Sequence, residues 1–267
     1  MENKNRNEHL AEFYAFIIET MDPEKIFCLP PQNGTAAEKD YADVLITVPD
    51  IPVKSLLEVE IAIKFATLNY RNLLGTISET FHLDKMIRCG NIYFNVACSE
   101  QNLVYNKLNW KKPEMNKGAK AEMKARADAT FYKGMQKANV FYSTAKICQE
   151  HHAAMSAFLL HQATEICLRT LMKALIGKDK NTHRIQELLI YSTRYHHELV
   201  NMITDGSKED DRQLKLLDNA YQGYRYADDY KIEEKDLTTL MERVAHLHQA
   251  VERTFMDWMK RYEMIPE

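Results

Sequence analysis

The chain has 267 residues, 45% of them hydrophobic, which is enough to bury the core of one large domain or of two ordinary ones. Its formal net charge of -3 gives no global attraction for nucleic acid or anionic lipid, so a phosphate site would need a local cluster of cations. A secretory signal, a membrane-spanning apolar run and paired C-x-x-C cysteines are all missing from the sequence, which favours a cytoplasmic globular protein without a membrane partner.

The N-terminal part, residues 1–115, alternates between helix-like and strand-like segments. Its predicted elements, in chain order, are a helix at 8–21, strands at 25–29 and 41–50, a helical region over 53–87 interrupted near Gly75, and a strand at 91–98. This order predicts a small α/β layer.

The C-terminal part, residues 116–267, contains no convincing strand. Its predicted helices lie at 116–152, as one helix or two in line, at 157–175, at 181–203 after an Asn181 or Thr182 cap, at 207–224 after a Ser207 and Asp210 capping box, and at 233–262. Short loops between long amphipathic helices indicate an antiparallel bundle. The fold class is therefore α+β, with a small α/β domain followed by an all-α domain.

The helix predicted at 157–175 is apolar except for one polar seam. Stepping at about 100° per residue places His161, Gln162, Glu165, Arg169 and Lys173 in one sector. Either Glu165 and Arg169 pair within a buried network that fixes the helix register, or the seam faces a ligand groove. His161 and Glu165 have a spacing that metal ligands can use, but no third ligand is visible. A hydrogen-bonded network is favoured, and no metal or cofactor is expected.

Three segments in this order resemble the HEPN domain, a helical family linked to nucleotide binding. They are "SAFLLHQATEICLRTLMKAL", "THRIQELL" and "YQGYRYADDY", and the resemblance covers residues 120–256. It implies a groove for nucleotides or RNA, and pairing of two copies around the arginine-containing segment as a homodimer. The candidate ligand-binding residues are Arg225, Tyr224, Tyr226 and Tyr230, together with Glu165, Arg169 and His161. Packing between two helices is the alternative role for the tyrosines.

The same resemblance bears on catalysis. Many HEPN domains resemble metal-independent ribonucleases, in which an arginine is followed four to six residues later by a histidine. Here Arg225 and Asp228 are present, but Tyr230, Lys231 and Ile232 stand where the histidine would be. Tyrosine transfers protons poorly near neutral pH. Arg243 and His248 fit the spacing by count alone, so no catalytic residue is assigned.

HEPN domains often follow a minimal nucleotidyltransferase domain, and residues 26–50 resemble its strand, loop and strand weakly. The resemblance implies a Gly-Ser turn, two acids on the second strand and a third acid on a later strand. Here Leu29, Pro30 and Pro31 occupy the turn, Asp43 is alone, and the third predicted strand offers Asn95. Prolines remove the N–H donors that bind phosphate, and carboxylates are the ligands of the metal ions. We therefore expect a degenerate domain without metal.

A basic stretch joins the two parts: Lys107, Lys111, Lys112, Lys117, Lys120, Lys124 and Arg126. Such a run is most often a solvated linker face, although it is also the best local phosphate-binding patch of the chain.

Taken together, the sequence predicts a dimeric nucleotide- or RNA-binding module without catalytic turnover and without a DNA-specific motif. A ribonuclease with an atypical site and a purely structural interaction module are the alternatives.

Overall fold

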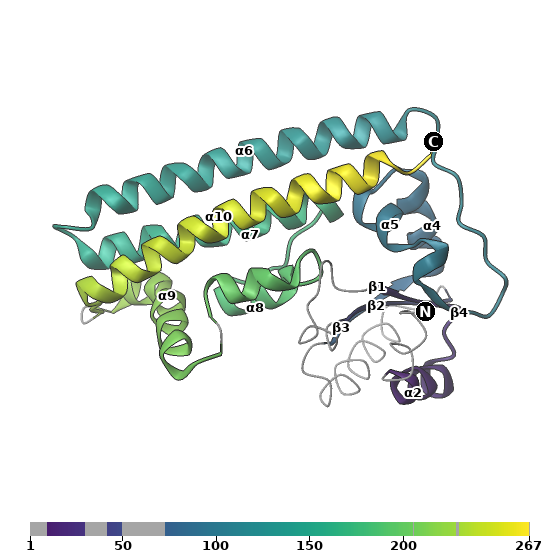
Figure 1. The fold of residues 1–267 in the computed structure, drawn as a ribbon, viewed down its shortest axis with the longest axis horizontal. Coiled ribbons are helices and arrows are strands. Elements are labelled where there is room, and N and C mark those ends of the chain that lie inside the picture. Colours follow the sequence, from purple (N-terminus) through teal and green to yellow (C-terminus); the bar gives the residue numbers. More distant parts are fainter. Residues whose placement is uncertain (1–9, 30–41, 50–72, 205, 228–229, 267) are drawn as a thin grey trace. The chain divides into compact units, whose positions relative to one another are not determined.

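The structure is a computed structural model that describes residues 10–29, 42–49, 73–204, 206–227 and 230–266 (Figure 1). Its internal contacts divide the chain into two compact units, Met1–Lys120 with Ile265–Glu267, and Ala121–Met264. We call the first the mixed unit and the second the helical unit.

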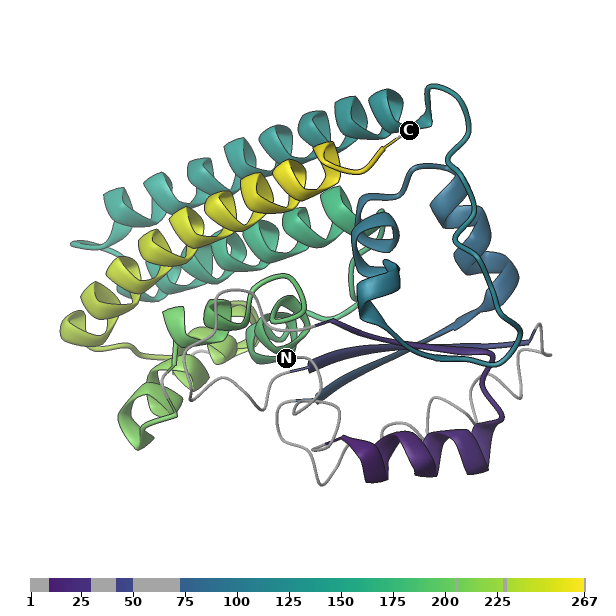
Figure 2. The same cartoon turned by 45° about the vertical axis from the view of Figure 1, so that its right-hand side comes forward.

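The mixed unit is built on a four-stranded sheet in the order β3-β2-β1-β4. The strands are β1 (Lys25–Leu29), β2 (Ala42–Val48), β3 (Leu73–Glu79) and β4 (Leu103–Asn106), which follows the short 3-10 helix η3 (Glu100–Asn102). Strand β1 pairs antiparallel with β2 and β4, whereas β2 and β3 are parallel. Figure 2 shows helix α2 (Ala11–Met21) on one face of the sheet and α4 (Thr80–Arg88) and α5 (Ile92–Ala97) on the other.

Alternating side chains explain this layering. Ile26, Val44 and Ile46 belong to one apolar cluster with Phe13 and Ile17 of α2. The intervening residues of the strands face the opposite layer, where the Phe27 ring meets the Trp110 ring edge-on at 5.5 Å. Strand β2 is buried along its whole length, as expected for a strand covered on both faces.

Two predictions in the mixed unit are wrong. Residues 73–79 form strand β3 instead of helix, because Gly75 weakens a helix and the segment pairs in register with all seven residues of β2. Residues 92–97 form helix α5 instead of a strand. The Asn91 side chain accepts a hydrogen bond from Phe94 N at 3.2 Å and so caps this helix. The predictions for residues 53–72 lie outside the described residues.

The helical unit confirms the predicted long helices. It contains α6 (Ala119–Cys148), α7 (Ala153–Ile176), α8 (Ile185–Ser192), the 3-10 helix η4 (His197–Met202), α9 (Lys208–Tyr226) and α10 (Glu234–Glu263). Helices α6, α7 and α10 run side by side, and α8 and α9 pack on α7 (Figure 1). Among the described residues, no helix has both the length and the apolar composition required to cross a membrane.

The core of the helical unit lies between its long helices. The apolar stripe of α10 is buried, and it comprises Leu237, Leu240, Met241, Val244, Leu247, Val251 and Trp258. The Phe131 ring of α6 stacks on Phe255 of α10 at 3.8 Å between centroids. Helix α6 also approaches α7 closely, since a methyl group added at Gly134 would lie 2.1 Å from the Thr170 hydroxyl.

The prediction of a single helix over residues 181–203 is wrong. The chain forms α8 and η4 instead, with Arg184 as the N-cap of α8 and without a side-chain cap. Near the break, the buried Tyr195 carbonyl accepts a hydrogen bond from the buried Trp258 indole at 2.9 Å. Ser207, in contrast, caps α9 as predicted, because its hydroxyl accepts a hydrogen bond from Asp210 N at 3.1 Å.

Candidate functional site

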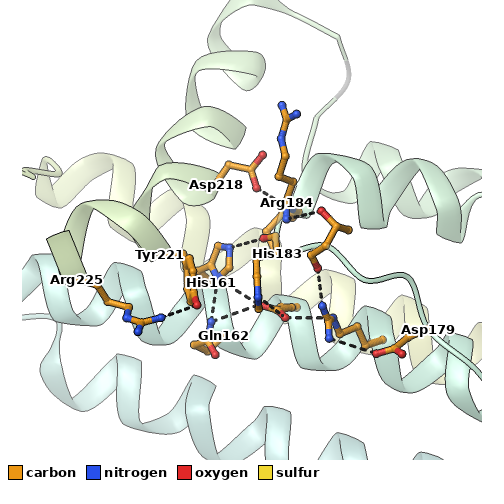
Figure 3. Close-up of polar contacts among 12 residues, drawn as sticks. His161, Gln162, Asp179, His183, Arg184, Asp218, Tyr221 and Arg225 are labelled. Atoms are coloured by element: carbon orange, nitrogen blue, oxygen red, sulfur yellow. Dashed lines mark hydrogen bonds and ion pairs between the residues drawn. The ribbon is translucent and has the colours of Figure 1, made fainter. Parts of the chain in front are cut away.

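The polar seam of α7 is the starting point of the site. Its residues sit in a helix that is otherwise buried, and His161 and Glu165 are 0% and 6% exposed. Buried polar groups of this kind are costly unless they have partners. The seam finds its partners in the segment between α7 and α8 and in the last two turns of α9 (Figure 3).

His161 is held in one tautomer. Its Nε2 lies 2.9 Å from the backbone carbonyl of His183, which can only accept, so Nε2 carries the proton. Its Nδ1 then accepts from the Gln162 side-chain amide at 3.2 Å. Burial lowers the pKa of His161 to about 4. At neutral pH this ring is therefore neutral, and both of its nitrogens are occupied.

Glu165 is the centre of the seam. Its Oε1 lies 3.1 Å from Arg169 Nε one turn further along α7, which is the predicted intrahelical pair. His183 Nδ1 lies 3.1 and 3.2 Å from the two carboxylate oxygens. Gln162 donates to Oε2 at 3.4 Å. One nearly buried carboxylate thus orients an arginine and a histidine.

Arg169 extends this network into the α7–α8 segment. It donates to the Thr182 carbonyl at 2.6 Å and to Asp179 Oδ2 at 3.3 Å. Lys173, the last residue of the predicted seam, also contacts Asp179 Oδ2, at 3.2 Å. The cations at this end of the seam are therefore matched by an acid and a carbonyl.

Tyr221 connects the seam to α9. Its ring stacks on the His183 ring, with 4.8 Å between centroids and 9° between planes, and its centroid lies 5.4 Å from that of His161. Its hydroxyl accepts a hydrogen bond from Arg225 at 2.5 Å. The Arg225 guanidinium also lies 5.1 Å from the centre of the Tyr221 ring and 5.0 Å from that of Tyr226.

We call His161, Gln162, Glu165, Arg169, His183, Tyr221 and Arg225 the seam cluster. Within the described residues, Arg225 contacts aromatic groups and has no carboxylate partner, and its side chain is exposed. Asp228 and Asp229, which follow Arg225 in the sequence and whose carboxylates could neutralise the guanidinium, lie outside the described residues. Figure 3 shows Arg225 at one end of the cluster and Asp179 at the other.

A carboxylate of α9 fixes the segment that carries His183. The Asp218 side chain accepts a hydrogen bond from the Ile185 N–H, at the start of α8. Burial raises the pKa of Asp218, and the backbone N–H groups of Ile185 and Gln186 oppose this shift. Because Arg184 gives α8 no side-chain cap, Asp218 supplies one from another helix.

The predicted tyrosines divide into two groups. Tyr224 and Tyr226 are 44% and 73% exposed, and the Tyr224 ring stacks against Phe158 at 5.3 Å. Tyr230 instead packs against α9, where it leaves no room for a side chain at Gly223, and it donates to the Leu216 carbonyl at 3.1 Å. Burial raises the pKa of Tyr230 to about 12. Tyr230 thus has the packing role, whereas Tyr224 and Tyr226 offer exposed rings.

The structure separates Arg243 from His248. Arg243 contacts the Ile203 carbonyl and Asp210, with 2.5 Å to the carboxylate. His248 points to α6, where its Nδ1 lies 3.0 Å from Asn139 Oδ1, and burial lowers its pKa to about 4. The spacing along the chain therefore does not create a joint site.

Several residues of the basic stretch make local contacts. Within the mixed unit, Lys107 binds Asp22 at 2.6 Å and Lys112 donates to the Asn95 carbonyl at 2.7 Å. Within the helical unit, Lys124 pairs with Glu263. These partners weaken the interpretation of the stretch as a phosphate-binding patch.

Asp43 has a structural partner in the mixed unit. It is 4% exposed, and its Oδ2 accepts a hydrogen bond from the Tyr93 hydroxyl at 2.5 Å. Asn95, expected on a third strand, lies in α5, where its amide donates to the carbonyls of Ile87 and Asn91. In the parts of the chain that the structure describes, no three histidine, cysteine or acidic residues are placed to hold a metal ion.

Sequence reasoning missed His183 and Asp179. Both lie in the irregular segment between α7 and α8, where no periodicity identifies the direction of a side chain. The sequence held two signals. A buried carboxylate such as Glu165 can accept more hydrogen bonds than one arginine donates, and the seam carries two cations, Arg169 and Lys173, for one acid. Tyr221 is also absent from the candidate residues, although it lies in the same tyrosine-rich segment as Tyr224 and Tyr226.

A comparison with known protein families finds a match within the helical unit. Residues 133–254 match the sequence model of the HEPN domain. The matched range contains the whole seam cluster, and it does not include the mixed unit. No curated protein matches the chain.

Proposed function

We propose that the helical unit binds a nucleotide or RNA at the Arg225 end of the seam cluster, as a dimer and without catalytic turnover. The observation that carries the proposal is the state of Arg225. Its exposed guanidinium is fixed by the Tyr221 hydroxyl at 2.5 Å and by two aromatic rings, and no carboxylate among the described residues neutralises it. A fixed guanidinium fork matches the geometry of a phosphate.

Aromatic rings beside this guanidinium supply the second element of nucleotide recognition. The partly exposed Tyr224 and Tyr226 flank Arg225 along α9, and unpaired bases stack on such rings. Phosphate contacts position a nucleic acid, whereas stacking accepts any base. We therefore expect a site that prefers single-stranded RNA or free nucleotides over a duplex.

The tyrosine and histidine side chains considered as proton donors or acceptors for catalysis are poorly suited to that role. Tyr230, which stands where a HEPN ribonuclease has its histidine, donates to a carbonyl and has its pKa raised to about 12. His161 and His248 have pKa values lowered to about 4 and are buried. In the mixed unit, Asp43 is bound to Tyr93 and has no acid on β3 beside it. These features support binding without turnover.

The test is calorimetric titration of the full chain with a nucleotide panel and a short single-stranded RNA. We expect Arg225→Ala to weaken binding by about tenfold or more, since a charge-assisted hydrogen bond is worth about 1.5–3 kcal/mol. Arg253→Ala, which removes another exposed arginine on α10, is the matched control and should leave binding unchanged.

Each competing function gives a different result in this experiment. A structural role predicts no heat with any ligand and a lower melting temperature for Arg225→Ala. A ribonuclease predicts cleavage of the RNA without metal, which Arg225→Ala stops before it stops binding. Either result would overturn the proposal.

A further inference from the structure

Within the described part of the chain, the seam cluster holds one imidazole whose second nitrogen makes no hydrogen bond to the protein. The His183 side chain is 55% exposed, and its contacts are those of Nδ1 with Glu165 and of the ring face with Tyr221. The other histidine of the cluster, His161, has both nitrogens occupied. His183 Nε2 is therefore available to a ligand.

Glu165 determines whether His183 Nε2 donates or accepts a hydrogen bond. Its carboxylate oxygens lie 3.1 and 3.2 Å from Nδ1, and an ionised carboxylate only accepts, so Nδ1 carries the proton. In the neutral ring, Nε2 is then a hydrogen-bond acceptor. Arg169, 3.1 Å from Glu165, and the Gln162 amide hold the carboxylate in place.

The orientation of the ring is fixed as well. Stacking on Tyr221 at 9° sets its plane, and the His183 carbonyl accepts a hydrogen bond from His161 Nε2 at 2.9 Å. Asp218 anchors the following residues to α9 through the Ile185 N–H. A pre-organised acceptor of this kind loses little conformational entropy when a ligand binds.

His183 and Arg225 share Tyr221 as a neighbour. The His183 ring lies 4.8 Å, and the Arg225 guanidinium 5.1 Å, from the centre of the Tyr221 ring. The site therefore presents a guanidinium that can donate to a phosphate and, when the His183 ring is neutral, a nitrogen that can accept a hydrogen bond, both around one aromatic residue. A ribonucleotide carries the complementary pair, because a ribose hydroxyl that can donate lies only a few bonds from the phosphate.

We propose that His183 Nε2 accepts a hydrogen bond from the ribose 2′-hydroxyl of the ligand that Arg225 binds, so that the seam cluster selects ribonucleotides over deoxyribonucleotides. The inference rests on the proposed function, since it places the ligand at Arg225. Glu165 is a positioning residue in this arrangement, because it acts through His183.

The test compares ligands that differ in the 2′-hydroxyl alone. Single-stranded oligonucleotides of adenine and cytosine are prepared with ribose, 2′-fluororibose or deoxyribose and titrated into the full chain at pH 8. The 2′-fluoro strand keeps the RNA-like sugar shape but cannot donate. We expect the ribose strand to bind about tenfold more tightly than either of the others, as for one hydrogen bond to a fixed partner.

Variants then assign the preference to His183. His183→Ala should bind the ribose strand as weakly as the 2′-fluoro strand, while its affinity for the 2′-fluoro strand is unchanged. His183→Gln, which keeps an acceptor, should retain part of the preference. Glu165→Gln should reduce it through loss of the fixed tautomer. The matched control, His246→Ala, removes an exposed histidine of α10 and should leave the preference intact.

The outcomes separate this inference from the proposed function. Equal affinity for ribose and 2′-fluoro strands, with binding still dependent on Arg225, would overturn the role of His183 alone. Absence of binding by any strand would overturn both. Cleavage of the ribose strand that His183→Ala abolishes would support the hydroxyl contact and overturn the claim of binding without turnover.

Discussion

His161 and His248 are two buried histidines that remain neutral in the folded protein. Burial lowers the pKa of each from 6.5 to about 4, so the unfolded chain binds protons more readily than the folded one. Their stabilising effect is complete above the unfolded value and is lost as the pH falls toward the folded value. We expect the free energy of unfolding to drop by a few kcal/mol between pH 7 and pH 4.

Urea unfolding of wild type and His248→Gln at a series of pH values tests this expectation. The variant lacks one of the two groups, so its stability should fall less steeply below pH 6.5. His246→Gln, on the exposed side of α10, should follow wild type. Parallel curves for wild type and His248→Gln would contradict the assignment.

Residues differ in how far the sequence reveals their role. The 3.6-residue period placed His161, Glu165 and Arg169 on one line of α7, and the Glu165–Arg169 pair was correctly predicted. The same reasoning could not find His183, because its position depends on a turn, on Asp218 of another helix and on stacking against Tyr221. Periodicity describes a helix face, but it carries no information about irregular segments that fold against it.

At the scale of elements, the contact between α6 and α7 depends on a glycine. A Cβ at Gly134 would lie 2.1 Å from the Thr170 hydroxyl and 2.8 Å from its Cβ. Gly134→Ala should therefore lower the free energy of unfolding by about 1–3 kcal/mol, although alanine favours an isolated helix by about 1 kcal/mol. Denaturant unfolding measures the difference. Ser143→Ala on the exposed side of α6 is the control, and stabilisation by Gly134→Ala would refute the close contact.

The elements that sequence predicted correctly are those with a strong local signal. Helices α6, α7, α9 and α10 are long, β1 is a short apolar run, and β2 is rich in β-branched residues. The wrong predictions concern segments where tertiary structure decides. Strand β3 exists through its parallel pairing with β2, and α5 is buried on all sides, so its sequence has no helical period. The interruption between α8 and η4 likewise serves a contact with Trp258.

At the scale of the whole molecule, the helical unit leaves apolar side chains uncovered along α6. Tyr132, Val140 and Ile147 are 60%, 61% and 78% exposed, and they line a groove of about 540 Å³. Their spacing places them on one face of the helix. Large exposed apolar patches are typical of interaction surfaces, and we expect two copies related by a two-fold axis to bury this stripe against itself.

We therefore expect light scattering at tens of micromolar to give twice the chain mass of 31.2 kDa. Charges in this stripe would be buried without partners, so Val140→Glu combined with Ile147→Glu should produce the monomer. Ile190→Glu changes an exposed residue of α8 and should leave the dimer intact. A monomeric wild type would refute the dimer. A dimer that survives the paired substitution would refute this interface. The Arg225 end of α9 would then be the next interface to test.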